Sequence, residues 1–282
     1  MTAVPDLWPV DAPAPPCESS FANRVVIVLG SRRSGSTWLA QLLLSHPDMA
    51  GMEPNQDRFG AFHPRETMIF GSLWDVWTNA HGSDGIGIAT YLGRAGAAAA
   101  LRRFCDREFA DARDHFKPDA TWITEKTPSN SELLPMISVV YPDAWYIHLY
   151  RDGRDVARSL AGAPMGPDEV GEAAGEWAKR LEQDRQYRHL VSRYRAIRYE
   201  DLLADPVEKT LDFFRWIGLE VTPEVVAAVE ERAPRQVARY GQKDAVGSGK
   251  WRQLGPHDRA RIFNAAADWL AELGYLDSEP GA

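Results

Sequence analysis

Near the start of the chain, a short apolar run, a Gly/Ser loop and an apolar helix follow one another. Together they restrict the fold more than any other stretch. The run RVVIVLG (24–30) suits a buried parallel strand. The loop GSRRSGST (30–37) comes next, and TWLAQLLLSHP then favours a helix stopped by Pro47. Such a loop between a strand and a helix indicates an anion-binding turn in an α/β fold.

The loop differs at one position from a P-loop, the phosphate-binding turn of many nucleotide-binding proteins. A P-loop has two glycines separated by four residues, then Lys, then Ser or Thr. The present loop keeps both glycines and ends on Thr37, but Ser36 stands where the lysine would be. Its backbone N–H groups and the Ser34 hydroxyl can cradle an anion, and Arg33 adds positive charge. This donor set suits a diphosphate-sized or sulfated group better than a Mg-bound triphosphate, and no separate motif for Mg ligands is evident.

The composition indicates a globular protein and argues against a large polyanionic partner. The chain has 282 residues, of which 44% are hydrophobic and 26% are charged. This length is enough for one large α/β domain. The net charge of −8 disfavours nucleic acid as a partner. It leaves room for a local basic pocket that binds one small anion.

Cysteine usage and the N-terminal segment favour a cytoplasmic protein. Cys17 and Cys105 show no CxxC or metal-ligand spacing, so we expect reduced thiols. The first residues lack the basic start and apolar core of a signal peptide, and no apolar run approaches the ~20 residues of a membrane helix. With five prolines in its first sixteen residues, the segment 1–22 is expected to be a poorly ordered tail.

Further strands and helices are predicted to alternate along the chain. The strand candidates are TWIT (121–124), AWYIHLY (144–150) and RAIRY (195–199). The helix candidates are residues 95–113, 168–194 and 256–273. This alternation implies a mainly parallel central sheet flanked by helices. Ligands bind beyond the carboxyl ends of such strands, which here are residues 31–37, 125–126, 151–152 and 199–200.

The stretch RDGRDVARS (151–159) directly follows a predicted strand. Its Arg151 and Ser159 could hold a second phosphate, one through a guanidinium and the other through a hydroxyl. Asp152 or Asp155 could cap the helix that begins here. The alternative is a surface run of salt bridges, which is common for stretches of this composition.

Four motifs, RSGSTWL, YRDGRDVARS, IRYEDL and GKWR, follow one another in this order. In pattern and order they resemble the PAPS-dependent sulfotransferase family over about residues 24–275, and most closely its bacterial, carbohydrate- and tyrosine-type branches. PAPS is 3′-phosphoadenosine 5′-phosphosulfate, and PAP is what remains after sulfuryl transfer. The resemblance implies a P-loop-like, three-layer α/β fold, a PAPS donor and no metal. It implies one domain (23–282) in which 54–120 form an acceptor-binding insertion.

The resemblance also explains the missing lysine and implies a set of phosphate contacts. A phosphosulfate has no γ-phosphate for that lysine to reach. Arg151 and Ser159 would bind the 3′-phosphate. The chain departs from the family at Gly153, where Pro is frequent. The phosphosulfate would be bound by Arg33, Ser34, Gly35, Ser36 and Thr37.

The remaining donor contacts implied by the resemblance involve the nucleoside and a closing loop. Trp38 would stack on adenine, and Tyr199 would lie near the base. Gly249 and Lys250 would sit on a loop that closes over the 3′-phosphate. This tail motif is shorter than the glycine-rich stretch of the phenol- and steroid-sulfating branch.

Sulfuryl transfer needs a base for the acceptor hydroxyl and a cation for the leaving oxygen. Branches that resemble this chain use a glutamate shortly after the HPD that ends the first helix, which favours Glu53 as the base. His63 is the alternative, because the phenol- and steroid-sulfating branch uses a histidine further along. The EKTP stretch would place Lys126 beside the sulfuryl group, where its charge stabilises the leaving phosphate oxygen. Glu125 would orient Lys126 or touch the acceptor.

Two other functions stay open beside sulfuryl transfer to a small-molecule, sugar or glycolipid hydroxyl. One is a P-loop-type nucleotide or metabolite kinase, which the missing lysine disfavours. The other is a non-catalytic nucleotide-binding protein of the same fold, which the pairing of Glu53 with Lys126 disfavours. Phe70, Trp74 and Trp77 could line the acceptor pocket or belong to the core. The Ala- and Arg-rich composition suggests a bacterial source, and the oligomeric state is left open.

Overall fold

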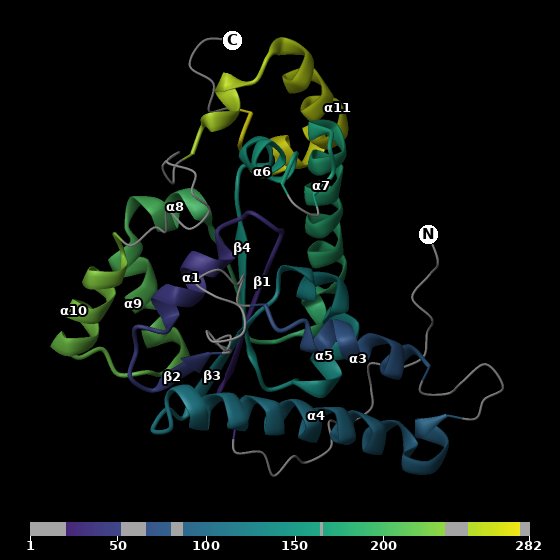
Figure 1. Ribbon diagram of the computed structural model, residues 1–282, viewed down its shortest axis with the longest axis vertical. Helices are drawn as coiled ribbons and strands as arrows, with labels where there is room; N and C mark the ends of the chain where they lie inside the picture. Colours follow the sequence, from purple (N-terminus) through teal and green to yellow (C-terminus); the bar gives the residue numbers. More distant parts are fainter. Residues whose placement is uncertain (1–20, 52–65, 80–86, 164–165, 235–247, 277–282) are drawn as a thin grey trace.

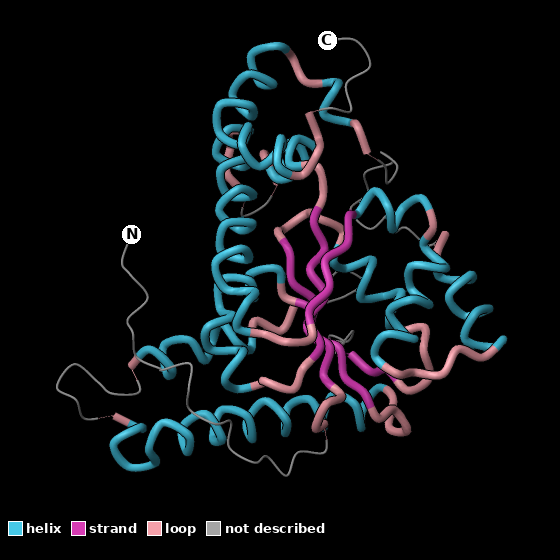
Figure 2. Tube along the Cα trace, turned by 180° about the vertical axis from the view of Figure 1, so that it is seen from behind, coloured by secondary structure: helices cyan, strands magenta, loops and turns pink. Residues whose placement is uncertain are grey.

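The strands of the protein form one parallel sheet. The computed structural model describes residues 21–51, 66–79, 87–163, 166–234 and 248–276 (Figure 1). Within these residues five strands run in the order β2-β3-β1-β4-β5, and all neighbours are parallel. Figure 2 shows the strands together at the centre, with helices on both sides. The strands are β1 (Val25–Gly30), β2 (Met49–Gly51), β3 (Trp122–Lys126), β4 (Trp145–Tyr150) and β5 (Tyr194–Arg198). Their carboxyl ends therefore share one edge of the sheet.

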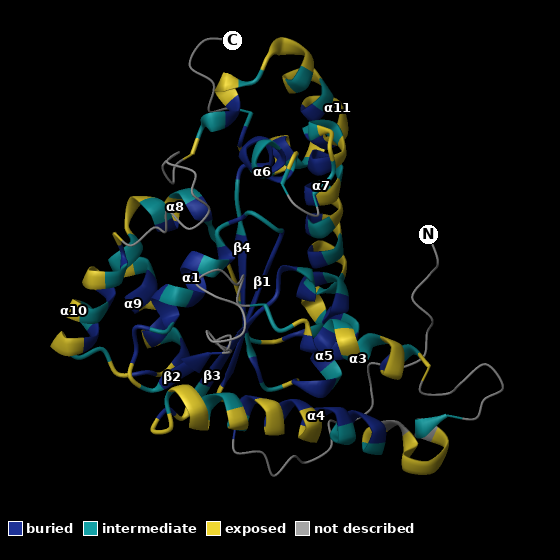
Figure 3. Cartoon of the chain, in the orientation of Figure 1, coloured by how far each residue is buried: buried dark blue, intermediate teal, exposed yellow. Residues whose placement is uncertain are grey.

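The central strand β1 is buried along its whole length, as its β-branched run predicts. It lies between β3 and β4, with Val28 in register with Lys126 and Gly30 in register with Leu149. Figure 3 shows buried residues along the strands and on the inward sides of the helices. The Gly/Ser loop therefore starts at the middle of the sheet.

One face of the sheet is covered by α1 and by three later helices (Figure 1). Even-numbered residues of β1, such as Val26 and Val28, pack here against Leu39 and Leu42 of α1. Phe213 and Phe214 belong to the same cluster, so the helix that carries them is part of the core. The helices are α1 (Ser36–Leu43), α8 (Tyr199–Ala204), α9 (Pro206–Ile217) and α10 (Pro223–Arg232).

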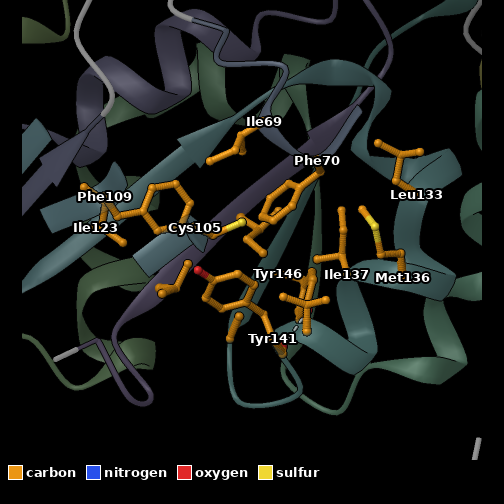
Figure 4. Packing of buried hydrophobic residues seen from close by; sticks show 14 of the residues in the cluster. Ile69, Phe70, Cys105, Phe109, Ile123, Leu133, Met136, Ile137, Tyr141 and Tyr146 are labelled. Carbon is orange, nitrogen blue, oxygen red and sulfur yellow. Dashed lines mark hydrogen bonds between the residues drawn. The ribbon is translucent and has the colours of Figure 1, made fainter. Parts of the chain in front are cut away.

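The opposite face packs on a second cluster (Figure 4). Phe70, Phe109 and Tyr141 meet there, with ring centroids 5.8–6.5 Å apart. Cys105 lies in this cluster as a buried thiol, whereas Cys17 falls outside the described residues. The covering elements are α3 (Ile69–Thr78), α4 (Ile88–Phe116), the 3₁₀ turn η1 (Pro128–Leu133) and α5 (Leu134–Val140).

A third cluster joins the helices beyond the end of β4 to the C-terminal helix. Trp177 and Leu270 are among its most buried members. The 3₁₀ turn η2 (Arg188–Leu190) directly follows the second of these helices, which spans 170–187. The cluster is built mainly from α6 (Gly153–Leu160), α7 (Val170–Tyr187) and α11 (Pro256–Glu272). The 3₁₀ turn η3 (Lys250–Gln253) contacts α6 beside it.

The predicted α/β class with a mainly parallel sheet is confirmed, and all four predicted strands are present. The strand predicted at 121–124 extends to residue 126, so Lys126 is the last residue of β3. The Ala-rich helix is longer than predicted and has non-helical backbone at Gly93 (φ 65°). The three-residue β2 was not predicted, because a strand that short carries no alternation to detect. The helices α3 and α10 were not predicted either.

The predicted tail (1–22) and the predicted insertion (54–120) are each described only in part. Residues 1–20 of the predicted tail lie outside the described part, while Phe21 is fully buried against Phe109. In the segment 54–120, Phe70 and Trp77 are buried in the second cluster and Trp74 packs against it. In the described structure these aromatic residues therefore belong to the core.

Glu125 is a fully buried carboxylate near the end of β3. Thr127 and Thr67 donate hydrogen bonds to its Oε1 at 2.6 and 2.9 Å, and Asn130 Nδ2 donates to Oε2 at 2.5 Å. Burial nevertheless raises the pKa of Glu125 above the ordinary carboxyl value, since desolvation outweighs the hydrogen bonds and the nearby Lys126. This carboxyl group therefore links folding to proton binding.

Gly30→Ala is expected to destabilise the protein by about 1–3 kcal/mol, the scale of an overpacked core site. Gly30 has φ +148°, and a Cβ there would lie 2.5 Å from the backbone oxygen of Leu149. The free energy of unfolding in urea measures this cost. The matched variant is Gly175→Ala in α7, where nothing lies within 4 Å of the added Cβ. That helix-interior change should stabilise by about 0.5–1 kcal/mol, and equal effects of both variants would contradict the packing described for β1 and β4.

As the pH rises, the wild type is expected to lose unfolding free energy relative to the variant Glu125→Gln. A carboxyl group whose folded pKa is raised contributes its stability below the unfolded pKa and loses it as pH rises through the folded pKa. The loss amounts to at most about 1.4 kcal/mol per pH unit. Unfolding free energies of both proteins between about pH 4.5 and 8 measure the difference.

The control for this pH series is Glu108→Gln, at an exposed position on α4. Its difference from the wild type should stay small throughout. A wild-type advantage over Glu125→Gln that grows with pH would show instead that the three donors stabilise the anion more than burial penalises it.

Candidate functional site

The loop between β1 and α1 is held in shape by its own serines. Ser34 is fully buried, its Oγ donates to the Ser31 carbonyl at 2.8 Å, and the two Oγ atoms lie 2.6 Å apart. Gly35 has φ 96°, a backbone conformation that favours glycine. A Cβ at Gly35 would lie 2.7 Å from the Tyr199 ring. The loop is therefore a tight turn pressed against the start of α8.

The start of α1 is open to an anion. No side chain caps it, and its first turn has no acidic residue. The first N–H groups of a helix have no partner within the helix, and the helix dipole makes this end positive. Ser36 is buried and Thr37 is half-buried in this first turn, so their amides and hydroxyls lie where the sequence predicts them. These groups together can bind one phosphate- or sulfate-sized group.

The start of α6, at the next strand end, differs from that of α1 because carboxylates already occupy it. Asp152 caps the helix by accepting from the N–H of Arg154 at 2.9 Å, and Asp155 lies in its first turn. Glu200 accepts from the Asp152 N–H at 3.1 Å. Of the two predicted caps, Asp152 therefore serves as the cap. An anion at this edge is therefore expected at the uncapped start of α1, not at the start of α6.

Arg33 connects the loop to α6. Its Nε donates to Ser159 Oγ at 2.9 Å. Its backbone has φ 68°, which is uncommon for a residue other than glycine and is found at functional sites more often than elsewhere. The predicted phosphosulfate residue and the predicted 3′-phosphate residue are thus direct neighbours.

Arg151, at the carboxyl end of β4, completes a basic edge with Arg33. Its guanidinium lies 4.5 Å from the centroid of the Tyr199 ring, and Nη1 donates to the Arg33 carbonyl at 3.2 Å. Asp155 Oδ2 lies 3.7 Å from Nη2. Stacking on an aromatic ring fixes the plane of a guanidinium and leaves its edge for anions. Arg33, Arg151 and Ser159 therefore form one cluster, although 126 positions separate the outer two.

The predicted adenine contacts are also neighbours. Trp38 packs edge-on to Tyr199 with centroids 5.9 Å apart, and it is 7% exposed. Its indole Nε1 is buried with no hydrogen-bond partner among the described residues. Much of the Trp38 ring belongs to the core around α1.

The C-terminal motif lies against α6 through Asp155. The backbone N–H groups of Gly249 and Trp251 donate to the two carboxylate oxygens of Asp155 at 2.6 and 2.9 Å. Gly249 has φ 80° and precedes the turn η3, whose first residue is Lys250. Since Asp155 also faces Arg151, the predicted closing segment is beside the predicted 3′-phosphate contact.

Lys126 reaches the same edge from β3. It is 2% exposed, and its Nζ lies 3.0 Å from Glu66 Oε1. Lys126 is in register with Val28, so its side chain is on the α1 face of the sheet. Glu125 is on the opposite face, where Thr67, Thr127 and Asn130 hold it. Full burial leaves Glu125 no surface with which to touch an acceptor.

Other features of the site were outside the reach of the sequence, or lie outside the described residues. Glu53 and His63 fall in 52–65, which the structure does not describe. The contacts of Glu66 with Lys126 and of Asp155 with the tail were not predicted, because about 60 and 94 positions separate the partners. Only the fold brings them together.

Two further findings concern metals and membranes. Among the described residues, no group of three or more His, Cys, Asp or Glu side chains could hold a metal ion. No helix in that part of the chain is both long and apolar enough to cross a bilayer.

The arrangement offers two groups of anion-binding donors at one edge of the sheet, and Lys126 ends the strand next to β1 at that edge. One group is the open α1 start with its loop, and the other is Arg151 with Ser159, which both contact Arg33 of that loop. Group transfer between bound partners needs this kind of positioned positive charge and no covalent intermediate with the protein.

The comparisons with known proteins agree on one family. A family model described as "Sulfotransferase family" matches residues 25–223. Human carbohydrate sulfotransferase 5 is 24% identical over an alignment 338 positions long, which covers 95% of this chain and 82% of that protein.

Solved structures show the same fold. The sulfotransferase domain of the Synechococcus PCC 7002 olefin synthase superposes with a TM-score of 0.54 at 19% identity, covering 92% of this chain and 96% of that domain. A Mycobacterium avium sulfotransferase gives a TM-score of 0.52 at 17% identity, covering 93% of this chain and 78% of that one. A mouse sulfotransferase in complex with PAP gives 0.50 at 14% identity, covering 90% and 88%.

The family match spans more than half of the chain, from β1 to the start of α10. It includes the loop, Lys126 and the Arg151 motif. The family predicted from the motifs is confirmed: this chain belongs to the sulfotransferase family and is a PAPS-dependent sulfotransferase with an α/β fold.

Proposed function

We propose that the protein transfers the sulfuryl group of PAPS to a hydroxyl of a small-molecule, sugar or glycolipid acceptor. The observation that carries the proposal is the open start of α1 flanked by Arg33 and Arg151. In this arrangement the loop and α1 bind the 5′-phosphosulfate, and Arg151 with Ser159 binds the 3′-phosphate. The mouse structure with PAP supports this donor, and the human relative named for carbohydrate sulfation supports a sugar hydroxyl.

The remaining donor contacts follow the same assignment. The phosphosulfate is bound by Arg33, Ser34, Gly35, Ser36 and Thr37. Adenine lies against Trp38 and Tyr199, whose rings adjoin. Gly249 and Lys250 cover the 3′-phosphate from the segment that Asp155 holds.

The chemistry is one in-line displacement. The acceptor oxygen forms a bond to sulfur while the bond from sulfur to the 5′-phosphate oxygen breaks, and that oxygen keeps the electron pair. Lys126 stabilises the negative charge that develops on this leaving oxygen. Glu53 takes the acceptor proton, with His63 as the alternative base.

Chain length supports both base candidates. Gly51 ends β2 and pairs with Thr124, two residues before Lys126. Glu53 follows Gly51 by two residues, so at most about 7 Å of extended chain separates their Cα atoms. His63 precedes Glu66 by three residues, or at most about 11 Å. The order of the motifs favours Glu53 between the two. The cytoplasmic location and the bacterial source stay predictions.

The donor assignment is tested by calorimetric titration with PAP, adenosine 5′-phosphosulfate and ATP–Mg. The wild type should bind PAP in the micromolar range or tighter and ATP–Mg much more weakly. Arg151→Ala should weaken PAP by about 10- to 100-fold, the scale of one lost charge-assisted hydrogen bond. Adenosine 5′-phosphosulfate should be affected far less, because it lacks the 3′-phosphate.

The control for this series is Arg195→Ala, which removes an exposed arginine that stacks on Trp216 at 4.6 Å. Its PAP affinity should match the wild type. Equal losses of PAP and adenosine 5′-phosphosulfate in Arg151→Ala would contradict its role at the 3′-phosphate. Preference for ATP–Mg would favour a kinase instead.

Glu53→Gln should bind PAP nearly as well as the wild type but transfer sulfate about 100-fold more slowly or worse, the scale of lost general-base catalysis. PAP release from PAPS during turnover of an acceptor hydroxyl measures this rate. His63→Ala is the companion variant and should keep most of the activity. Normal turnover in Glu53→Gln together with loss in His63→Ala would transfer the role to His63.

A further inference from the structure

The contacts of Lys126 suggest a role for a residue that the function proposed above does not use. This inference rests on that proposed function, in which the Lys126 ammonium stabilises the leaving oxygen. A lysine ammonium is a point charge on a flexible four-carbon stem, so its direction has to be set by neighbours. Lys126 is only 2% exposed, so its stem is buried by the elements packed around the end of β3.

Glu66 is a neighbour in direct contact with this ammonium. Its Oε1 lies 3.0 Å from Lys126 Nζ, and its side chain is 26% exposed. An exposed ion pair of this length contributes little. This pair differs, because the ammonium is buried and removal of the carboxylate would take a negative charge away from a desolvated cation.

The backbone that carries Glu66 is fixed to the end of β3 by the two residues that follow. Thr67 Oγ1 donates to the buried Glu125 at 2.9 Å, and the Met68 N–H donates to Thr127 Oγ1 at 3.4 Å. Each of the residues 66–68 thus contacts one residue of the segment 125–127. A carboxylate on a fixed backbone can hold an ammonium in one place.

The strain at Met68 is consistent with a fixed segment. Its φ is 54°, an unfavourable backbone conformation for a residue other than glycine. Such a conformation persists where the surroundings hold it. The Ile69 N–H also bonds to Thr67 Oγ1 at 3.1 Å, which joins the segment to the first turn of α3.

We propose that Glu66 is a positioning residue that holds the Lys126 ammonium in the direction of the leaving oxygen of the sulfuryl donor. Glu66 accepts from one of the three N–H donors that a lysine ammonium carries. During the transfer Lys126 keeps its proton. The electron pair of the broken S–O bond stays on the phosphate oxygen, and the proton of the attacking hydroxyl or water leaves from the other side of the sulfur.

A double-mutant cycle on PAPS cleavage tests this role. The four proteins are the wild type, Glu66→Gln, Lys126→Met and the double variant. The readouts are the slow release of PAP from PAPS with water as the acceptor and the calorimetric affinity for PAP. Glu66→Gln should cleave PAPS at least 10-fold more slowly with a PAP affinity within about threefold of the wild type. The double variant should be no slower than Lys126→Met, because Glu66 acts only through Lys126.

Two matched variants separate positioning from a structural role. Glu66→Asp keeps the charge one methylene further away and should restore part of the rate, whereas a merely structural loss would not follow charge. Glu108→Gln, at an exposed position on α4, should match the wild type. Thermal unfolding of each protein confirms that the variants are folded.

Each opposing outcome has its own meaning. Additive losses in the cycle would show that Glu66 acts independently of Lys126 and would overturn the proposal, as would a faster rate in Glu66→Gln. Normal cleavage in Lys126→Met would instead overturn the role of Lys126 in the proposed function. Absence of PAP binding and PAPS cleavage in the wild type would overturn the proposed function itself.

Discussion

The close approach of β1 and β4 at Gly30 is the constraint on which the site depends. The Leu149 carbonyl occupies the place where a Cβ of residue 30 would be, so the loop leaves β1 directly beside the end of β4. The chain runs from β1 to β2 and β3 on one side and reaches β4 and β5 on the other. Ligands bind where a parallel sheet divides in this way. Lys126 and Arg151 therefore lie at or just after the ends of the two strands that flank β1.

The distribution of charge around that loop shows how an acidic protein can bind a dianion. The chain carries a net charge of −8, yet the carboxylates next to the basic edge are already engaged. Asp152 caps α6, Asp155 accepts two tail amides, and Glu200 accepts an amide and the Tyr275 hydroxyl. Because these anions are satisfied by protein donors, they oppose a bound phosphate less than free carboxylates would. The uncapped start of α1 stays the most favourable place for the ligand.

The sequence predicted the parts of this site whose logic is local. A β-branched run before a Gly/Ser loop and an Arg at a strand end are local features, and Arg33, Arg151 and Ser159 lie together as expected. Contacts between distant segments could not be predicted, because no pattern in ETM or TEKT states that Glu66 faces Lys126. The substitution at Gly153 is a further case: a Cβ there would lie 2.5 Å from the Trp177 ring, 24 positions later. The packing of Trp177 explains a glycine that sequence comparison could only register as a departure.

Burial divides the carboxylates near Lys126 into different roles. Glu125 adjoins Lys126 in sequence, but strand alternation turns it to the opposite face, where full burial and three donors make it an anchor. Glu66 is distant in sequence, but it contacts the ammonium and keeps part of its surface exposed. The anchor and the partner are connected, since Thr67 links the segment of one to the side chain of the other. A buried carboxyl group on one face of β3 thereby holds the segment whose Glu66 contacts Lys126 on the other face.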